Sequence, residues 1–130
     1  MDCDILCHRP LCGMWDIDMT GKAVYGASDM YEGDISFYNR LQYYPSEGYF
    51  NAGVLLINLS YWREHNCEKV FLDFMANHYD RIFHHDQDIL NYTLRGAKGR
   101  LPFKYNVQDG YLYPEYHFLK WPYEDEFREA

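Results

Sequence analysis

The chain has 130 residues, of which 48% are apolar and 19% aromatic, and its formal net charge is −8. This apolar content is enough for a buried core, so the composition excludes a disordered chain and predicts at most one domain. Twelve basic residues against 20 acidic ones argue against a nucleic-acid partner, because phosphate binding needs a surface rich in Lys and Arg. The longest uninterrupted apolar run, residues 52–57, is far shorter than the roughly 20 residues that span a bilayer, so no transmembrane segment is expected.

The first part of the chain is expected to consist of short extended segments and loops. Residues 5–7 form a short extended segment, and residues 15–19 alternate apolar with polar side chains. A turn signal then precedes a second extended run at residues 23–27. We predict strands over 15–19 and 23–27. Residues 30–44 are polar and rich in tyrosine without a clear period, so they are predicted to be a loop.

The middle of the chain predicts a buried strand followed by helices. Residues 50–59 contain a continuous β-favouring run, which is typical of a strand that is buried on both faces. Ser60 offers an N-cap for a helix. Residues 66–79 then place apolar side chains at spacings of one, three and four, the pattern of an amphipathic helix.

A further helix and a last strand complete the prediction. The helix begins at Asp86, has Leu90 on its inner face and ends near Gly96. Residues 103–107 resemble a strand, whereas residues 111–130 have no assignment. Strands that alternate with helices predict an α/β fold with a mixed sheet flanked by helices.

Two carboxylates near the N-terminus are candidate metal ligands. Asp2 and Asp4 are two residues apart, so on an extended backbone both side chains project to the same side. Oxygen ligands of this kind suit Mg²⁺ or Mn²⁺. The same spacing recurs at Asp16 and Asp18 and at Asp86 and Asp88. Spacing alone therefore does not choose between the three pairs, and each also fits a solvated turn or a helix start.

Polar side chains in two other segments are candidates for binding a sugar. Asn51 lies beside an apolar strand, where its carboxamide offers a donor and an acceptor to a hydroxyl. It also fits an ordinary strand end that makes local backbone bonds. An Asp cap would explain Asp86 or Asp88 at the start of a helix, but it gives Gln87 no purpose.

The motifs Phe-Asn-Ala-Gly-Val at residues 50–54 and Asp-Gln-Asp at residues 86–88 closely resemble those of glycosyltransferase family 8. That resemblance implies the C-terminal part of a GT-A fold. It implies transfer of a hexose from a nucleotide-diphosphate sugar, such as UDP-glucose or UDP-galactose, to a saccharide acceptor with retention of anomeric configuration. Members of the family include enzymes of lipopolysaccharide biosynthesis.

The resemblance also assigns roles to single residues. Asp2 and Asp4 take the metal, Mn²⁺ or Mg²⁺, because Asp16 and Asp18 match a structural stretch of the family. Asp29 corresponds to a position that contacts the acceptor. The residues implied in donor-sugar binding are Asn51, Ala52, Gly53, Asp86 and Gln87. Asp86 and Gln87 are also the implied catalytic residues. Because a carboxamide is a poor nucleophile, front-face substitution is favoured over a double displacement through Gln87.

The resemblance further predicts that residues 1–130 form a partial catalytic domain. The family's nucleotide-binding portion ahead of the metal motif is absent, and so is its C-terminal motif for metal and diphosphate. We therefore expect this polypeptide alone to be inactive and cytoplasmic, with the intact enzyme peripheral at the inner face of the membrane. An open sheet edge predicts a homodimer.

Two alternatives stay open at this point. The chain could be a catalytically inactive module, for sugar binding or assembly, that keeps the same core. It could also be a small metal protein that uses Cys3, Cys7 and Cys12, although this spacing lacks the repeated Cys pair of zinc motifs. His84 and His85 are adjacent, so on extended backbone they point to opposite faces and do not share an ion.

Overall fold

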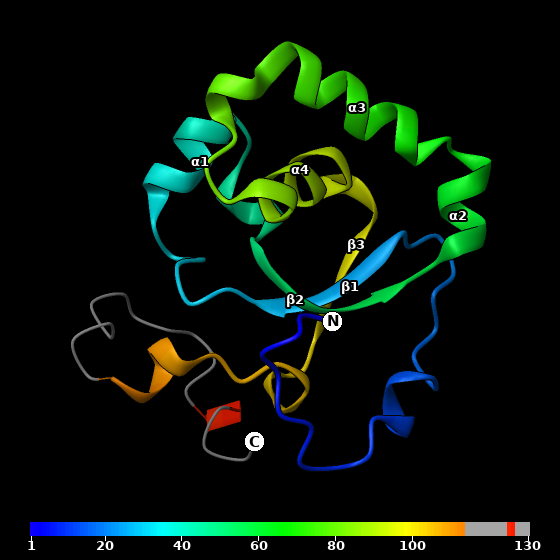
Figure 1. Cartoon of the computed structure of the whole chain (residues 1–130), viewed down its shortest axis with the longest axis vertical. Helices are drawn as coiled ribbons and strands as arrows, with labels where there is room; N and C mark the ends of the chain where they lie inside the picture. The colour runs from blue at the N-terminus through cyan, green and yellow to red at the C-terminus, as the bar shows by residue number, and fades with distance from the viewer. Residues whose placement is uncertain (114–124, 127–130) are drawn as a thin grey trace.

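The computed structural model describes residues 1–113 and 125–126. Its sheet contains β1 (Val24–Ser28), β2 (Phe50–Ile57) and β3 (Lys98–Leu101) in the order β2-β1-β3. β1 pairs antiparallel with β2 and parallel with β3. The predicted α/β class with a mixed sheet is confirmed (Figure 1).

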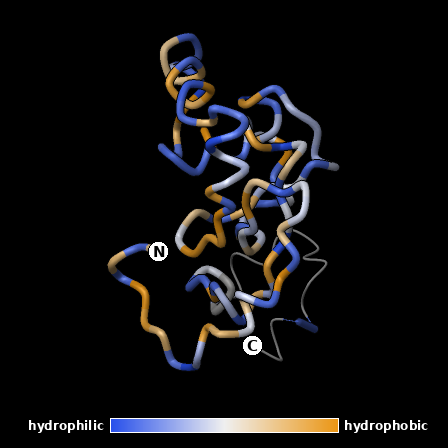
Figure 2. Tube along the Cα trace, turned by 90° about the vertical axis from the view of Figure 1, so that its right-hand side faces the viewer, coloured by the Kyte–Doolittle hydropathy of each residue, from blue (hydrophilic) through white to orange (hydrophobic). Residues whose placement is uncertain are grey.

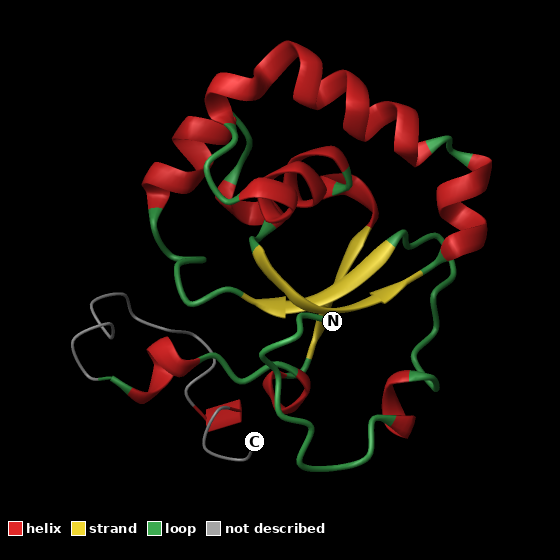
Figure 3. Cartoon of the chain, in the orientation of Figure 1, coloured by secondary structure: helices red, strands yellow, loops and turns green. Residues whose placement is uncertain are grey.

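Four α-helices lie on one face of this sheet in the described part of the chain. They are α1 (Ile35–Leu41), α2 (Leu59–Glu64), α3 (Cys67–His78) and α4 (His85–Thr93). α4 lies directly over the strands, and α3 arches over α4 as an outer layer (Figure 1). The N-terminal segment and the short 3₁₀ turns that follow β3 lie on the opposite side (Figure 3). In the perpendicular view the N-terminal segment forms an outlying loop (Figure 2).

The core follows from the alternation of side chains along the strands. Val54 and Leu56 point to the face that the N-terminal segment covers, whereas Leu55 points to the helical face. On the helical face Phe50 packs with Leu90 of α4. A third cluster, rich in aromatic residues, fills the space between α1, α3 and α4; its buried members are Phe37, Tyr38, Leu41, Tyr43, Tyr49, Phe74 and Ile89. Apolar contacts on the helical face therefore fix α4 to the sheet, and those on the opposite face fix the N-terminal segment to it.

Several predicted elements are present with nearly the expected bounds. β1 is shifted by one residue from the predicted 23–27, and β2 forms within the predicted 50–59. α3 and α4 match the helices predicted from residues 66 and 86. The helix after β2 also forms, but its cap is Asn58, not Ser60. The side chain of Asn58 accepts a hydrogen bond from the Tyr61 N–H.

The strand predicted over residues 15–19 is wrong. A 3₁₀ helix at Cys12–Met14 is followed by turns. Ile17 and Met19 pack on the sheet face while Trp15 is exposed. The alternation of apolar and polar residues therefore comes from a coil that crosses the sheet, since one side of such a segment is buried in the same way as one side of a strand.

The loop predicted over residues 30–44 is also wrong, because it contains α1. Asp34 caps this helix by accepting a hydrogen bond from the Ser36 N–H at 2.8 Å. Phe37 and Leu41, four residues apart, are buried. The helix is only seven residues long, which is why its period does not stand out among the neighbouring tyrosines.

The last strand lies earlier than predicted. β3 covers Lys98–Leu101, and Phe103–Tyr105 within the predicted strand form a 3₁₀ turn. Pro102 separates the two segments and lacks the N–H that would continue the ladder. Most of residues 111–130, which had no assignment, lie outside the described residues.

A bulge interrupts the pairing of β1 and β2. Gly26 pairs with Leu55 and Ser28 pairs with Phe50, so two steps along β1 match five steps along β2. The backbone groups of residues 51–53 are therefore released from the regular ladder. Bulges of this kind often lie beside functional sites, where they redirect side chains and free backbone groups.

Candidate active site

Two side chains of α4 bind the beginning of β2 directly. Gln87 accepts a hydrogen bond from the Ala52 N–H at 2.9 Å. Asn91, one helical turn later, accepts from the Phe50 N–H at 2.9 Å and donates to the Phe50 carbonyl at 2.8 Å. Four helical residues rise about 6 Å and two strand residues about 6.6 Å, so the two spacings match. The bulge and α4 thus form one hydrogen-bonded unit.

Asp29, directly after β1, joins Asn51 to Gln87. Its Oδ2 accepts a hydrogen bond from the Asn51 Nδ2 at 3.1 Å and from the Gln87 Nε2 at 3.0 Å. Its Oδ1 accepts from the Tyr31 N–H at 2.9 Å. Asp29 is only 4% exposed, and no ion pair neutralises it within the part of the chain that the structure describes. This buried carboxylate fixes both carboxamides and leaves a negative charge beside them.

Residues near the N-terminus lie beside the bulge, close to Asn51. Asn51 Oδ1 accepts hydrogen bonds from the Gly53 N–H at 2.9 Å and from Asn106 Nδ2 at 2.8 Å. The Asp2 N–H donates to the Gly53 carbonyl at 2.9 Å. A Cβ at Gly53 would lie 2.9 Å from Asn51 Oδ1 and 3.4 Å from Asp2 Oδ2. A side chain at position 53 would therefore require Asn51 to shift.

The other predicted carboxylates are exposed. Asp86 lies in the first turn of α4, and its side chain makes no hydrogen bond or ion pair with any described residue. Asp4 is exposed in a turn at residues 3–4, so the extended backbone expected between Asp2 and Asp4 is absent. Among residues 1–113 and 125–126, no three His, Cys, Asp or Glu side chains gather as a metal site. Asp2 and Asp4 supply oxygen ligands of the kind that Mg²⁺ or Mn²⁺ takes, without a third.

The surroundings of Asp88 differ from those of Asp86. It is fully buried and forms a two-point ion pair with Arg40 of α1, at 2.7 Å and 3.0 Å. It also accepts hydrogen bonds from the Tyr49 hydroxyl and from the N–H groups of Phe83 and His84, each at 2.7 Å. Burial alone would raise the pKa of Asp88, but the bonds from Arg40 and the other donors hold it below its usual value.

Several residues of this region have no signal in the local sequence. Arg40 and Tyr49 both bind Asp88, and Asn106 binds Asn51, and these partners lie 39 to 55 positions apart in the chain. Asn91 follows Gln87 by four residues. That helical spacing could have identified Asn91 as a second polar residue on the face that carries Gln87.

A cavity of about 310 Å³ lies beside the site, between β1, β3 and the segment that precedes β2. Lys98 lines it and donates hydrogen bonds to the Gly48 carbonyl at 2.7 Å and to Asn91 Oδ1 at 2.9 Å. Burial lowers the pKa of Lys98 to about 7. Burial also raises the pKa of Glu32 in the same cavity.

Comparison with known proteins decides the family. The sequence matches the model of glycosyl transferase family 8 over residues 1–126. The chain belongs to glycosyl transferase family 8. It is similar to a probable glycosyl transferase of Streptococcus gordonii, with 33% identity over 106 residues, 82% of this chain and 14% of that protein. It is also similar to the lipopolysaccharide 1,3-galactosyltransferase of Salmonella typhimurium, with 28% identity over 115 residues, 83% of this chain and 34% of that protein.

A solved structure supports the same family. The galactosyltransferase LgtC, in complex with donor and acceptor sugar analogues, superposes with a TM-score of 0.67 at 32% identity, covering 72% of this chain and 34% of that one. The sheet and helices of this family 8 chain are therefore part of a GT-A fold. The chain spans about a third or less of the length of these relatives. None of its described helices is long and apolar enough to cross a membrane.

Proposed function

We propose that this chain forms the donor-sugar side of the active site in a retaining hexosyltransferase. The donor would be a nucleotide-diphosphate sugar, UDP-glucose or UDP-galactose, and the acceptor a saccharide. The observation that carries the proposal is the joining of Asn51, Asp29 and Gln87 by two hydrogen bonds to one carboxylate oxygen. Family membership and the similarity to a lipopolysaccharide galactosyltransferase support it.

The charge of the site suits the proposed reaction. The bond from the anomeric carbon to the diphosphate breaks, and both electrons leave with the phosphate oxygen. The acceptor oxygen bonds to that carbon and passes its proton to the leaving phosphate. Positive charge develops on the sugar ring during this exchange. The buried carboxylate of Asp29, which has no ion pair among the described residues, would stabilise it together with Asp86.

The geometry of Gln87 supports front-face substitution. Its Oε1 accepts the Ala52 N–H and its Nε2 donates to Asp29. An amide oxygen already engaged by a backbone donor is a still weaker nucleophile than a free one. In this proposal Gln87 orients the donor sugar, and the dipole of its carboxamide stabilises the positive charge on the sugar ring. No covalent sugar intermediate forms on it. Asn51 Nδ2 has two hydrogens; one binds Asp29, and the other would donate a hydrogen bond to a sugar hydroxyl.

The proposed function is tested by transfer activity in the natural protein that contains this chain. With radiolabelled UDP-glucose and UDP-galactose and a saccharide acceptor, we expect transfer with retention, which the anomeric coupling constant of the product reports by NMR. Gln87→Ala should lower kcat on the order of a hundredfold. Asn77→Ala removes an exposed amide of α3 and should not change kcat. Equal activity of the two variants, or an inverted product, would contradict the proposal.

We propose that Asp2 and Asp4 bind Mn²⁺ or Mg²⁺, which would neutralise charge on the leaving diphosphate. Asp2 is suited to this because its Oδ2 already lies beside Gly53 and Asn51. Mn²⁺ added to the chain should broaden backbone NMR signals around Asp2 and Asp4, and an Asp2→Asn, Asp4→Asn double variant should abolish the effect. Broadening centred on Asp16 and Asp18 would show that Asp2 and Asp4 are not the metal ligands. We do not expect this result, because Asp18 already accepts a hydrogen bond from the Thr20 N–H.

A further inference from the structure

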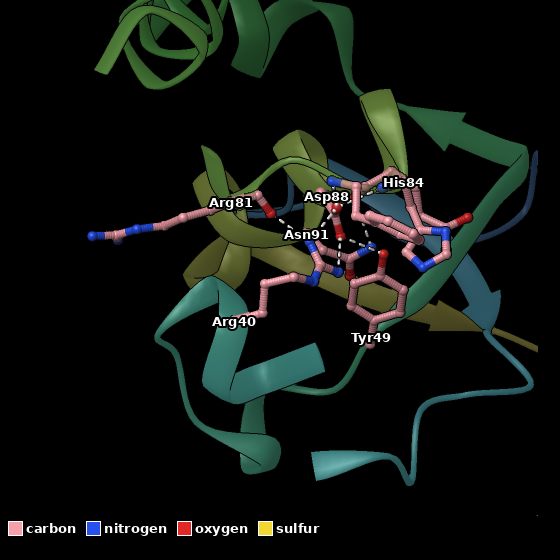
Figure 4. Close-up of polar contacts among 8 residues, drawn as sticks. Arg40, Tyr49, Arg81, His84, Asp88 and Asn91 are labelled. Atoms are coloured by element: carbon pink, nitrogen blue, oxygen red, sulfur yellow. Dashed lines mark hydrogen bonds and ion pairs between the residues drawn. The ribbon is translucent and has the colours of Figure 1, made fainter. Parts of the chain in front are cut away.

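Three residues hold the segment that leads into α4. Asp88 Oδ2 accepts hydrogen bonds from the N–H groups of Phe83 and His84, and Arg40 donates to the Arg81 carbonyl and to Asp88. Tyr49, which precedes β2, donates its hydroxyl to Asp88 Oδ1. We call Arg40, Tyr49 and Asp88 the Asp88 cluster. Figure 4 shows its side chains converging from α1, from the start of β2 and from α4.

The cluster is well placed to resist movement. The Asp88 side chain is 0% exposed and that of Arg40 is 26% exposed. The guanidinium lies 5.5 Å from the Phe37 ring centre and 5.8 Å from that of Phe83. The His84 ring stacks on Phe37 at 4.9 Å. Buried ion pairs whose oxygens are all hydrogen-bonded have one well-defined geometry, because moving either partner leaves a charge unpaired in the interior.

The backbone between the cluster and Gln87 adopts an uncommon conformation. His85 has φ of +47°, a left-handed value that a residue with a Cβ seldom takes. Such a conformation persists when surrounding contacts fix it. Here the fixed contacts flank it: Asp88 holds Phe83 and His84 on one side, and Asn91 holds the Gln87 carbonyl at 2.9 Å on the other. The direction in which Asp86 and Gln87 project therefore depends on the Asp88 cluster.

Tyr49 connects the cluster to Gln87 most directly. Its carbonyl accepts the Asp29 N–H at 2.9 Å, so it also fixes the carboxylate that orients Gln87. Burial, then the charge of Asp88 and the hydrogen bond to it, raise the pKa of the Tyr49 hydroxyl, whereas the Gln87 side chain lowers it. The hydroxyl thus lies next to both Asp88 and Gln87 and stays protonated as a donor.

We propose that Arg40 and Tyr49, acting with Asp88, are positioning residues that set the orientation of the Gln87 carboxamide for sugar transfer. This inference rests on the proposed function. It extends the site to α1 through Arg40. The cluster is tested through Tyr49 because Asp88→Asn or Arg40→Met would leave a buried charge unpaired and endanger folding.

The experiment compares Tyr49→Phe with Tyr43→Phe. Both tyrosines are buried in the same aromatic cluster, and each donates one hydroxyl hydrogen bond, Tyr49 to Asp88 at 2.7 Å and Tyr43 to the Gly48 carbonyl at 3.0 Å. We expect both variants to melt at similar, slightly lowered temperatures. In the natural protein, well below melting, Tyr49→Phe should lower kcat about tenfold with an unchanged KM for the donor, while Tyr43→Phe keeps the wild-type kcat.

A second readout needs no enzymatic activity. The ¹⁵N-labelled side-chain amide signals of Gln87 in the free protein should shift and exchange faster with solvent in Tyr49→Phe and stay unchanged in Tyr43→Phe. If both variants leave these signals unchanged, or alter them equally, the positioning role is refuted. If the wild type transfers no sugar yet the Gln87 signals respond to Tyr49→Phe alone, the proposed function is wrong and the positioning of Gln87 stands.

Discussion

At the scale of single residues, Asp86 and Asp88 have the same side chain and opposite surroundings. Asp88 is buried against Arg40 and accepts the N–H groups that precede α4. Asp86 is exposed in the first turn, and the helix cap position, His84, makes no side-chain cap hydrogen bond. The structural role expected at the start of this helix therefore belongs to Asp88, and Asp86 is left available to a ligand.

Replacing Asp86 by Asn separates these roles. Because the exposed Asp86 side chain makes no hydrogen bond or ion pair with other described residues, Asp86→Asn should change the free energy of unfolding by less than about 0.5 kcal/mol. If Asp86 stabilises a cationic transition state, kcat of the natural protein should fall on the order of a hundredfold. Steady-state kinetics and thermal melting measure the two effects.

The control for this variant is Glu68→Gln, an exposed acid in the first turn of α3. It removes the same charge from the same helical position away from the site, so kcat should not change. A near wild-type kcat for Asp86→Asn would remove Asp86 from the catalytic residues.

The motif residues were predictable from the sequence, and their mutual contacts were not. Asn51 and Gln87 were identified from local motifs, and the structure joins them through Asp29. Asp29 was assigned to the acceptor by resemblance, a role that stays a prediction, and its place between the two amides depends on a contact 58 residues away in the chain. A local pattern carries no information on such a contact.

At the scale of elements, the bulge in β2 decides how the site is built. In a regular strand the N–H groups of residues 51–53 would point alternately toward β1 and away from it, whereas here the Ala52 N–H donates to Gln87 and the Gly53 N–H donates to Asn51. Gly53 leaves room for this arrangement, because a Cβ there would lie 2.9 Å from Asn51 Oδ1.

Gly53→Ala tests the bulge. The added methyl group must displace Asn51, so we expect a loss of about 1–3 kcal/mol in the free energy of unfolding, as for other overpacked sites. Urea unfolding measures it. In Gly96→Ala, where no heavy atom lies within 4 Å of the new Cβ, the change should stay within about 0.5 kcal/mol. Equal effects of the two substitutions would show that the bulge tolerates a side chain.

Two elements that the sequence predicted, β2 and α3, have long and regular patterns, whereas α1 and β3, which it missed or misplaced, are short. β2 has eight residues and α3 has twelve, which is enough for a period to stand out. α1 has seven residues and β3 four. β3 contains one fully buried apolar residue, Leu101, and it forms because β1 supplies a parallel partner. This pairing joins residues that are far apart in the chain, so the local sequence of β3, Lys-Gly-Arg-Leu, does not predict it.

At the scale of the whole molecule, the predicted homodimer stays a prediction. β2 and β3 form the two edges of the described sheet, and Ile57 at the end of β2 is 37% exposed. Open edges of this kind pair with other chains. We expect self-association in sedimentation at about tens of micromolar, and a strictly monomeric chain would contradict it.

Lys98 ties β3, α4 and the segment before β2 together, through the Asn91 side chain and the Gly48 carbonyl. Burial lowers its pKa from the ordinary 10.5 to about 7. Between these two values the unfolded chain binds more protons than the folded one, so the contribution of Lys98 to the free energy of unfolding rises with pH. A neutral amine still has two hydrogens, enough for both hydrogen bonds.

This linkage predicts a pH dependence that a single substitution removes. From about pH 6 to about pH 8.5, Lys98 should add on the order of 2 kcal/mol to the free energy of unfolding, and Lys98→Met should lose that increase. Urea unfolding of both proteins at several pH values gives the difference, in which the titration of the histidines cancels. Lys69→Met, at an exposed lysine paired with Asp73 on α3, should keep the wild-type slope. If Lys98→Met keeps that slope too, Lys98 is protonated in the folded protein throughout this range, and the junction of β3, α4 and β2 holds a charged ammonium group.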